Sequence, residues 1–341
     1  MSSSSGGAEV ALTPEANAFL GEIFGADFKV ARASEDASFR SYYRVHSQRG
    51  PFIFMDAPPD KEDSSPFVDI ARFLATHGVP VPRIHEARLG DGHLLLEDLG
   101  DVTYLKALAE GVDPGVLYQE AVTTLLDIQA TPNDSSSIAH RRTYDRPMLR
   151  RELALFTDWY VEGIRKTPIS SPDRDRFEEI FQLLLDQALS QPEVFVHRDY
   201  HCRNLMWRGE GGAAAVGVID FQDAVMGPVT YDLASLLRDC YVAWDGDFRR
   251  RVMTQWLAGA GARLGYEPSW ERFERDFDWM AIQRNMKAIG IFGRLSLRDG
   301  KHGYLNDIPR TMGYVRETLE RYPELSDLGH LLDRYAPLEA A

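Results

Sequence analysis

The sequence changes character near residue 100, and this change restricts the folds that the chain of 341 residues can adopt. Beyond Asp101, stretches with apolar residues at helical spacing fill most of the chain, as in Phe177–Leu189. Before it, an amphipathic helix that opens at Ser65 interrupts three runs typical of strands, which are Ser41–His46, Pro51–Asp56 and His93–Asp98. The pattern predicts an α+β fold with a small β-rich lobe over residues 1–99 and a large, mostly helical lobe over residues 100–341.

One segment of the helical half, Glu193–Asp232, contains strand-like runs and is the exception to this pattern. Val194–Val196 is a short apolar strand. Leu205–Trp207 and Ala215–Phe221 then flank the glycine-rich stretch Arg208–Ala214, and this arrangement predicts a hairpin.

The hairpin predicts where three polar side chains meet. With a turn centred near Gly212, Asn204 and Asp220 face one another at its open end, and Asp199 enters the same end from the preceding loop. Carboxylate and amide oxygens are ligands that suit Mg²⁺, which also takes waters and substrate phosphates. We expect Asn204 and Asp220 to hold Mg²⁺ and Asp199 to accept the proton of an attacking hydroxyl, which together equip the chain for phosphoryl transfer from ATP.

The spacing of these residues strengthens the interpretation. Asp199 and Asn204 stand as they do in the catalytic loop of kinases, and Asp220-Phe221 is similar to the metal-binding Asp-Phe pair of those enzymes. A single polar residue near a turn is more often a backbone cap, but the three together favour a reaction centre.

Two further residues of this segment are assigned to structural support. We expect Asp232, at the start of a helix, to hold the backbone of His197 and Arg198. We expect His197 to be a buried histidine that orients its neighbours and neither donates nor accepts a catalytic proton.

These motifs resemble those of the aminoglycoside phosphotransferase family, a branch of the protein-kinase-like fold that also holds choline and homoserine kinases. The resemblance covers nearly the whole chain and implies that fold, with its two lobes. It also implies that backbone groups from Glu97 to Leu99 bind the adenine of ATP. Only about a dozen residues separate Asp220 from Asp232, which leaves no room for the activation segment of a protein kinase and favours a small-molecule acceptor.

Within that family, several stretches are similar to the bacterial anomeric amino-sugar kinases of cell-wall recycling. This resemblance implies a cytoplasmic enzyme of peptidoglycan recycling that phosphorylates the anomeric hydroxyl of N-acetylmuramate and N-acetylglucosamine. The stretches are Asp36–Arg44, Met55–Pro59, Glu152–Tyr160, His197–Met206, Ile219–Gly227, Tyr231–Tyr241 and Gly293–Arg310.

The nucleotide-binding part departs from the kinase pattern in two ways. The expected phosphate loop has no glycine, so small side chains must let its backbone approach the phosphates, and its predicted contacts are Ala37, Ser38, Phe39 and Arg40. In addition, Met55 stands where the strand should carry a phosphate-binding lysine. Arg40, Arg44 and Lys61 are the three candidates to replace it, and the sequence does not choose among them.

Candidate acceptor contacts fall into three groups. His201, Arg203 and Asp223 border the predicted reaction centre. Trp159 and Tyr160 either stack on a sugar face or pack within a helix. Arg294 and Arg298, four residues apart near a predicted helix end, either bind a lactyl carboxylate or belong to a solvated face.

Charge and cysteine content limit the partners and the compartment. A net charge of −14 argues against nucleic acid and anionic membranes as partners. Two cysteines cannot build a disulfide framework, and no run approaches the roughly 20 apolar residues of a membrane span. We therefore expect a cytoplasmic enzyme whose partners are ATP and a small sugar, and the sequence leaves its oligomeric state open.

Other classes of protein compete with this interpretation. His197 and Asp199 with a distal histidine, His302 or His330, would form the facial triad of a non-haem iron oxygenase. That class uses a β-rich barrel, whereas the chain beyond Phe221 is helical. A non-catalytic nucleotide-binding relative would suit the absent lysine but would not need Asp199. Among enzymes, the aminoglycoside, choline and homoserine kinases remain alternatives.

Overall fold

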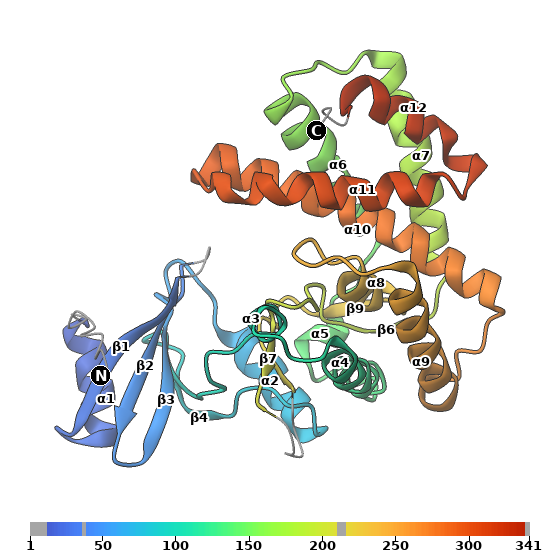
Figure 1. The fold of residues 1–341 in the computed structure, drawn as a ribbon. Coiled ribbons are helices and arrows are strands. Elements are labelled where there is room, and N and C mark those ends of the chain that lie inside the picture. The colour runs from blue at the N-terminus through green and yellow to red at the C-terminus, as the bar shows by residue number, and fades with distance from the viewer. Residues whose placement is uncertain (1–11, 36–38, 210–215, 338–341) are drawn as a thin grey trace. The chain divides into compact units, whose positions relative to one another are not determined.

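The computed structural model describes residues 12–35, 39–209 and 216–337 (Figure 1). The chain forms two compact units. The first consists of the described residues up to Val102 together with Met206–Asp223, and the second consists of Thr103–Leu205 together with the described residues from Ala224 onward. The predicted lobe boundary after residue 99 and the assignment of the nucleotide to the first lobe stay predictions.

The first unit is built on a five-stranded antiparallel sheet with the order β1-β2-β3-β5-β4, and its β2–β3 hairpin pairs Tyr43 with Phe54. Met206 and Trp207 belong to β7, which pairs with β8 in a second, two-stranded sheet. The strands are β1 (Phe28–Glu35), β2 (Ser41–Ser47), β3 (Gly50–Asp56), β4 (Ile84–Arg88), β5 (His93–Glu97), β7 (Leu205–Trp207) and β8 (Val216–Val218).

Among the described residues, the helices α1 and α2 complete the first unit. In α1 (Pro14–Phe24), Thr13 caps the N-terminus and Gly25 ends the helix with φ of 72°. Its buried side chains, such as Phe19, join a core with Phe54 and other residues of the sheet, so α1 covers one sheet face. In α2 (Ser65–Thr76), Phe67 packs on Phe221 with ring centroids 4.9 Å apart.

The second unit is mostly helical and contains the two-stranded antiparallel sheet of β6 (Glu193–Val196) and β9 (Val225–Pro228). Its helices are α3 (Tyr104–Ala109), α4 (Pro114–Gln129), α5 (Ile138–Arg141), α6 (Arg146–Leu155), the π-helix η1 (Phe156–Ile164), α7 (Ser171–Leu189), α8 (Tyr231–Leu237), α9 (Gly246–Leu264), α10 (Trp270–Asp299), the 3₁₀-helix η2 (His302–Asp307), α11 (Ile308–Leu319), the 3₁₀-helix η3 (Pro323–Leu325) and α12 (Ser326–Tyr335).

Helix α10, of 30 residues, is the central element of the second unit, and α6, α8 and η1 pack against it. Two glycines permit this packing. A Cβ atom on Gly290 would lie 2.3 Å from the carbonyl carbon of Leu155, and one on Gly293 would lie 2.9 Å from the carbonyl oxygen of Trp159. Both distances are shorter than real contacts, so only glycine lets α10 approach α6 and η1 so closely.

The predicted strands of the first sheet, the strand before the catalytic loop and the helix opening at Ser65 are confirmed, as is the first strand of the hairpin. The second strand is shorter than the predicted run Ala215–Phe221, because β8 covers Val216–Val218. The hairpin turn lies largely outside the described residues. The apolar spacing over Tyr231–Trp244 also predicts a helix, but α8 is shorter than that stretch and ends at Leu237. Among the described residues, none of the helices combines the length and the apolar character that a bilayer span requires.

Candidate active site

The loop after β6 brings Asp199 and Asn204 together. The Nδ2 amide of Asn204 donates to the backbone oxygen of Asp199 at 3.0 Å. Two backbone hydrogen bonds close the same turn, from His201 N to Asp199 O at 3.1 Å and from Asn204 N to His201 O at 2.9 Å. The turn therefore fixes the spacing between the carboxylate of Asp199 and the side chain of Asn204.

Asp232 holds the strand end from which this loop starts. Its fully buried carboxylate accepts hydrogen bonds from His197 N at 2.6 Å and from Arg198 N at 3.0 Å. Arg198 has φ of 79°, a left-handed conformation that costs a non-glycine residue about 1–3 kcal/mol. Two hydrogen bonds to one carboxylate offset that strain, because charge-assisted bonds are the stronger kind. This contact agrees with the supporting role assigned to Asp232.

The charge of Asp199 is stabilised by cations of the second unit. Burial by itself raises the pKa of its carboxyl group, but Lys287, then Arg198 and Arg284, outweigh burial and hold the pKa below its usual value. Asp199 is therefore ionised at neutral pH. An ionised carboxylate with a low pKa is a weak base that orients a hydroxyl group well.

Lys287 belongs to a buried ionic network around Glu152 of α6. Lys287 Nζ lies 3.0 Å from Glu152 Oε1, and the Arg198 guanidinium lies 2.8 Å from the same oxygen. The Tyr144 hydroxyl donates to the other carboxylate oxygen, to which Gln283 Nε2 also donates at 3.2 Å. Both carboxylate oxygens of Glu152 therefore have partners, as a buried charge requires.

The sequence analysis missed Lys287 and Arg284. Both are buried on α10, at 6% and 4% exposure, although α10 is otherwise a core helix with Ile282 and Met286 beside them. A signal was available, because charged residues at helical spacing on an apolar face are rarely buried without a partner.

Asp220 belongs to the first unit, two residues beyond β8, and its side chain is exposed. Its φ of 66° lies in the left-handed region, and Gln222 Nε2 donates to its Oδ1 at 2.7 Å. Among the described residues, Lys166, Arg198 and Asp220 are the non-glycine residues with positive φ, and the last two lie in the predicted catalytic segments. The approach of Asp220 to Asp199 and Asn204, which belong to the second unit, stays a prediction.

The three cations proposed to replace the missing lysine differ in their surroundings. Arg40 is 7% exposed, lies 2.6 Å from Glu62, and interacts electrostatically with Asp220. Arg44 is bound by two carboxylates, Asp98 at 2.6 Å and Asp101 at 2.5 Å. Lys61 Nζ lies 5.7 Å from the ring centroid of Phe39, which is 62% exposed. Ala37 and Ser38 lie outside the described residues.

The predicted adenine-binding stretch follows β5. Among the described residues, none makes a hydrogen bond to the backbone nitrogen or oxygen of Leu99. By contrast, Glu97 N donates to Arg83 O at 2.8 Å, and the Glu97 carboxylate pairs with Arg208 at 3.1 Å. The backbone of Leu99 is thus suited to receive the hydrogen bonds of a ligand, as backbone polar groups need partners.

The acceptor candidates of η1 and of the end of α10 are only partly consistent with ligand contact. Tyr160 is 7% exposed and packs on Phe156 at 5.5 Å, which agrees with helix packing. Trp159 is half-buried. Arg298 is exposed and pairs with Asp299 at 2.7 Å, as expected of a solvated face. Arg294 is half-buried, and burial followed by the neighbouring Arg298 lowers its pKa.

The three candidates predicted to border the reaction centre are at least partly accessible. His201 is partly buried and contacts the edge of Tyr241, with ring centroids 5.4 Å apart. Burial lowers the pKa of His201 to about 4, so this side chain is neutral at neutral pH. Arg203 in the second unit and Asp223 in the first are exposed.

The donor set suits magnesium better than iron. Asn204 and Asp220 offer amide and carboxylate oxygens, the ligands that Mg²⁺ prefers. The described residues include no cluster of three His, Cys, Asp or Glu side chains that could hold a metal ion. The histidines proposed for an iron triad have other partners, because His302 Nδ1 lies 2.8 Å from Ser296 Oγ and His330 is exposed beside Asp327.

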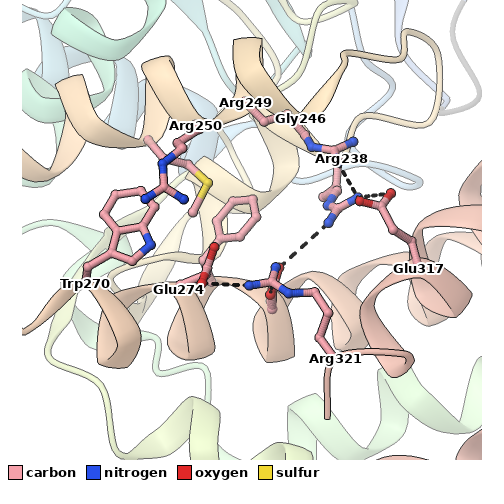
Figure 2. A pocket seen from close by; sticks show the side chains of 11 residues that line it. Arg238, Gly246, Arg249, Arg250, Trp270, Glu274, Glu317 and Arg321 are labelled. Atoms are coloured by element: carbon pink, nitrogen blue, oxygen red, sulfur yellow. Dashed lines mark hydrogen bonds and ion pairs between the residues drawn. The ribbon is translucent and has the colours of Figure 1, made fainter.

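A separate cavity of about 220 Å³ lies in the second unit (Figure 2). Its arginines are largely paired with its carboxylates: Arg238 lies 2.8 Å from Glu317, and Arg321 lies 2.7 Å from Asp278. Arg250 instead lies over the ring of Trp270, 4.6 Å from its centroid. None of the predicted site residues lines this cavity, so it is distinct from the candidate active site.

Comparison with known proteins decides the family. The model of the phosphotransferase enzyme family matches residues 29–272. The chain belongs to this family. It is 43% identical over 301 residues to the N-acetylmuramate/N-acetylglucosamine kinase of Pseudomonas aeruginosa, covering 88% of this chain and 86% of that protein. It is 36% identical to the kinase of the same name from Neisseria meningitidis, with 90% of both chains covered.

Solved structures of other kinases share the fold. The microcompartment-associated aminopropanol kinase aligns with a TM-score of 0.62 at 16% identity, covering 92% of this chain and 97% of that one. The Plasmodium vivax ethanolamine kinase aligns with a TM-score of 0.61 at 12% identity, covering 86% and 82%. The predicted protein-kinase-like α+β fold and the predicted resemblance to this family are confirmed.

Proposed function

We propose that the chain is an ATP- and Mg²⁺-dependent kinase that phosphorylates the anomeric hydroxyl of N-acetylmuramate and N-acetylglucosamine. One observation carries the proposal: four relatives, 32–43% identical over most of their length, bear the name of N-acetylmuramate/N-acetylglucosamine kinase. The sugar 1-phosphate product would serve peptidoglycan recycling in the cytoplasm.

Asp199 is the residue that receives the acceptor hydroxyl. The anomeric oxygen attacks the γ-phosphorus of ATP in line. The bond between the γ-phosphorus and the oxygen that bridges it to the β-phosphorus breaks, and ADP leaves. The proton of the hydroxyl passes to the Asp199 carboxylate. Because nearby cations keep the pKa of Asp199 low, orientation of the hydroxyl contributes more than base strength.

Asn204 and Asp220 are the proposed magnesium ligands. Chain connectivity supports their pairing, because Asn204 immediately precedes β7, Asp220 follows β8 after one residue, and β7 and β8 are neighbouring strands. The left-handed backbone of Asp220 is a further sign of a functional position. Bound there, Mg²⁺ would neutralise charge on the phosphates of ATP.

Arg40 is the cation that we assign to the place of the missing lysine. Of the three candidates, Arg44 is neutralised by two carboxylates, and Lys61 is drawn toward Phe39. Arg40 pairs with Glu62 and also interacts electrostatically with Asp220, the proposed magnesium ligand. A guanidinium close to a metal ligand is well placed for phosphate oxygens, which its planar donors match.

The remaining contacts with ATP involve backbone groups. Leu99 N and O, without intrachain hydrogen bonds among the described residues, would bind adenine together with the backbone at Glu97. The loop Ala37–Arg40 would cover the phosphates, as the resemblance to the family implies.

The experiment that tests the function uses the full chain with ATP, Mg²⁺ and a panel of amino sugars, aminoglycosides, choline and homoserine. Product mass and NMR identify the phosphorylated position. We expect N-acetylmuramate and N-acetylglucosamine to become 1-phosphates, and Asp199→Asn to lower kcat about 10²–10⁴-fold while ATP still binds. Preferential phosphorylation of choline, homoserine or an aminoglycoside would refute the acceptor assignment, and normal turnover by Asp199→Asn would refute the role of Asp199.

A further inference from the structure

Arg203 occupies a distinctive position at the end of the catalytic loop. It directly precedes Asn204, follows Asp199 by four residues, and its side chain is exposed. Its guanidinium carbon lies 4.7 Å from the ring centroid of Tyr241 and 5.7 Å from that of Tyr304. Segments about a hundred residues apart thus converge on one arginine beside the predicted reaction centre.

The two tyrosines are themselves held by aromatic packing. The ring of Tyr304 stacks on Phe292 of α10, with centroids 5.6 Å apart and an interplanar angle of 17°. Tyr241 contacts His201 edge-on at 5.4 Å and Phe292 at 6.5 Å. An arginine stacked on fixed rings has lost part of its rotamer freedom before a ligand arrives, and this preorganisation favours binding.

Within the part of the chain that the structure describes, Arg203 forms no ion pair. Among the described residues, no carboxylate oxygen lies within 4.0 Å of its guanidinium. Asp307 interacts with Arg203 at longer range, and its carboxylate pairs with Arg310 at 3.3 Å. Arg298, by contrast, is occupied by Asp299 at 2.7 Å. In a chain of net charge −14, an exposed arginine without such a contact is suited to an anion from outside.

We propose that Arg203, stacked on Tyr241 and Tyr304, binds the carboxylate of an acidic acceptor sugar and so sets the preference between the two acceptors. The inference rests on the proposed function. N-acetylmuramate carries a lactyl ether with a carboxylate, whereas N-acetylglucosamine has a hydroxyl group at that position. Guanidinium and carboxylate match in bidentate geometry, so Arg203 favours the acidic sugar and adds nothing comparable for the neutral one.

The test measures kcat/KM of Arg203→Met for N-acetylmuramate, for its neutral carboxamide derivative and for N-acetylglucosamine. A hydrogen-bonded charge contact is worth about 1.5–3 kcal/mol, so we expect the ratio of kcat/KM for N-acetylmuramate over N-acetylglucosamine to fall about 10–100-fold. The loss should appear mainly in KM. Wild type should discriminate against the carboxamide, and Arg203→Met should not. Arg203→Lys should restore part of the ratio.

Arg250→Met is the matched control, because Arg250 is also an exposed arginine stacked on an aromatic ring, that of Trp270 (Figure 2). This variant should leave the ratio unchanged. Turnover of both sugars with an unchanged ratio in Arg203→Met would overturn the inference alone. So would a selective loss in Arg294→Met with none in Arg203→Met. Turnover of neither sugar by wild type would overturn the proposed function and this inference with it.

Discussion

Lys287 Nζ lies 3.0 Å from Glu152 Oε1, and this buried ion pair joins α10 to α6. The same lysine is the principal cation that offsets burial in setting the low pKa of Asp199. One side chain therefore links the scaffold of the second unit to the residue proposed to receive the acceptor hydroxyl.

Replacing Lys287 by methionine should reduce both stability and activity. It leaves Glu152 with one cationic partner, Arg198, in a buried site, which should cost about 3 kcal/mol of unfolding free energy in urea titration. The pKa of Asp199 should rise, which moves the acid limb of the kcat–pH profile to higher pH. Lys106→Met, which removes an exposed lysine 3.9 Å from Glu110, should change stability by less than about 1 kcal/mol. Equal effects of the two changes would contradict the role of the network.

Replacing Arg40 by methionine should weaken ATP binding. Loss of a charged contact to phosphate should raise KM for ATP about 10–100-fold with less effect on KM for the sugar. Arg88→Met is the control, because Arg88 also pairs with a carboxylate of the first unit, Glu22 at 2.5 Å. An increase in KM for ATP in Arg44→Met with none in Arg40→Met would show that Arg44 is the phosphate-binding cation.

Replacing Asp220 by asparagine should weaken binding only when the metal is present. An amide oxygen lacks the charge that favours Mg²⁺, so calorimetry should show the Kd of Mg²⁺-ADP raised about tenfold or more. In EDTA, wild type and Asp220→Asn should bind ADP alike. A similar loss in both conditions would mean that Asp220 contacts the nucleotide without a metal ion.

The sequence predicted the local elements of the fold more completely than their pairing. The predicted strands of the first sheet had alternating or continuous apolar residues, and the helix α2 opened at Ser65 as its amphipathic pattern predicts. β1 and β4 were missed because neither is strongly apolar: Lys29 and Arg32 lie in β1, and β4 (Ile84–Arg88) is largely exposed or half-buried. Such strands are defined by their neighbours in the sheet and not by their own pattern.

The candidate site shows the same limit. Spacing along the chain was sufficient to select Asp199 and Asn204, because a loop of six residues brings them together. Lys287 and Tyr304 lie about 90 and 100 residues further along the chain. The apolar periodicity predicts that they lie on a helix or near its end, but it does not predict which residues they contact. Only tertiary packing, shown by the Lys287 pair with Glu152 and the Tyr304 stack on Arg203, assigns them to the site.

The pKa of Asp232 predicts that stability falls as pH rises. Ionisation of the same carboxylate, by contrast, strengthens its hydrogen bonds to the backbone before the catalytic loop. Burial, only partly offset by His197, raises this pKa to about 6, against an ordinary value of about 4. Because the folded pKa is raised, the stabilisation from protonated Asp232 is complete below pH 4 and is lost as pH rises through 6. This loss of stability is about 3 kcal/mol at neutral pH. At that pH the carboxylate is ionised and accepts the hydrogen bonds of His197 N and Arg198 N.

Asp232→Asn should remove this pH dependence. In urea titrations, the stability of wild type relative to the variant should fall by about 2–3 kcal/mol between pH 4 and pH 7.5, while the variant has the lower kcat at pH 7.5. Asp145→Asn, at an exposed helix cap that accepts from Met148 N at 2.8 Å, controls for the substitution itself. A stability difference that is constant with pH would contradict the raised pKa.

Two glycines in helices of the second unit should respond in opposite directions to alanine. A Cβ on Gly290 would lie 2.3–2.5 Å from backbone atoms of Leu155 and Phe156, whereas a Cβ on Gly313 of α11 would meet nothing within 4 Å. Gly290→Ala must therefore move α10 away from α6, at a cost of about 1–3 kcal/mol or more. Gly313→Ala should stabilise the protein by about 0.5–1 kcal/mol, because alanine is the better helix former.

Activity distinguishes local strain from displacement of the site. Lys287 lies one turn before Gly290, so a shift of α10 also stretches the ion pair with Glu152 and should lower kcat together with stability. Gly313→Ala should leave kcat unchanged. Suppose that Gly290→Ala loses stability but keeps full kcat at a temperature where it is folded. The close approach of α10 to α6 would then stabilise the fold without affecting catalysis, and the reaction would tolerate a displaced Lys287.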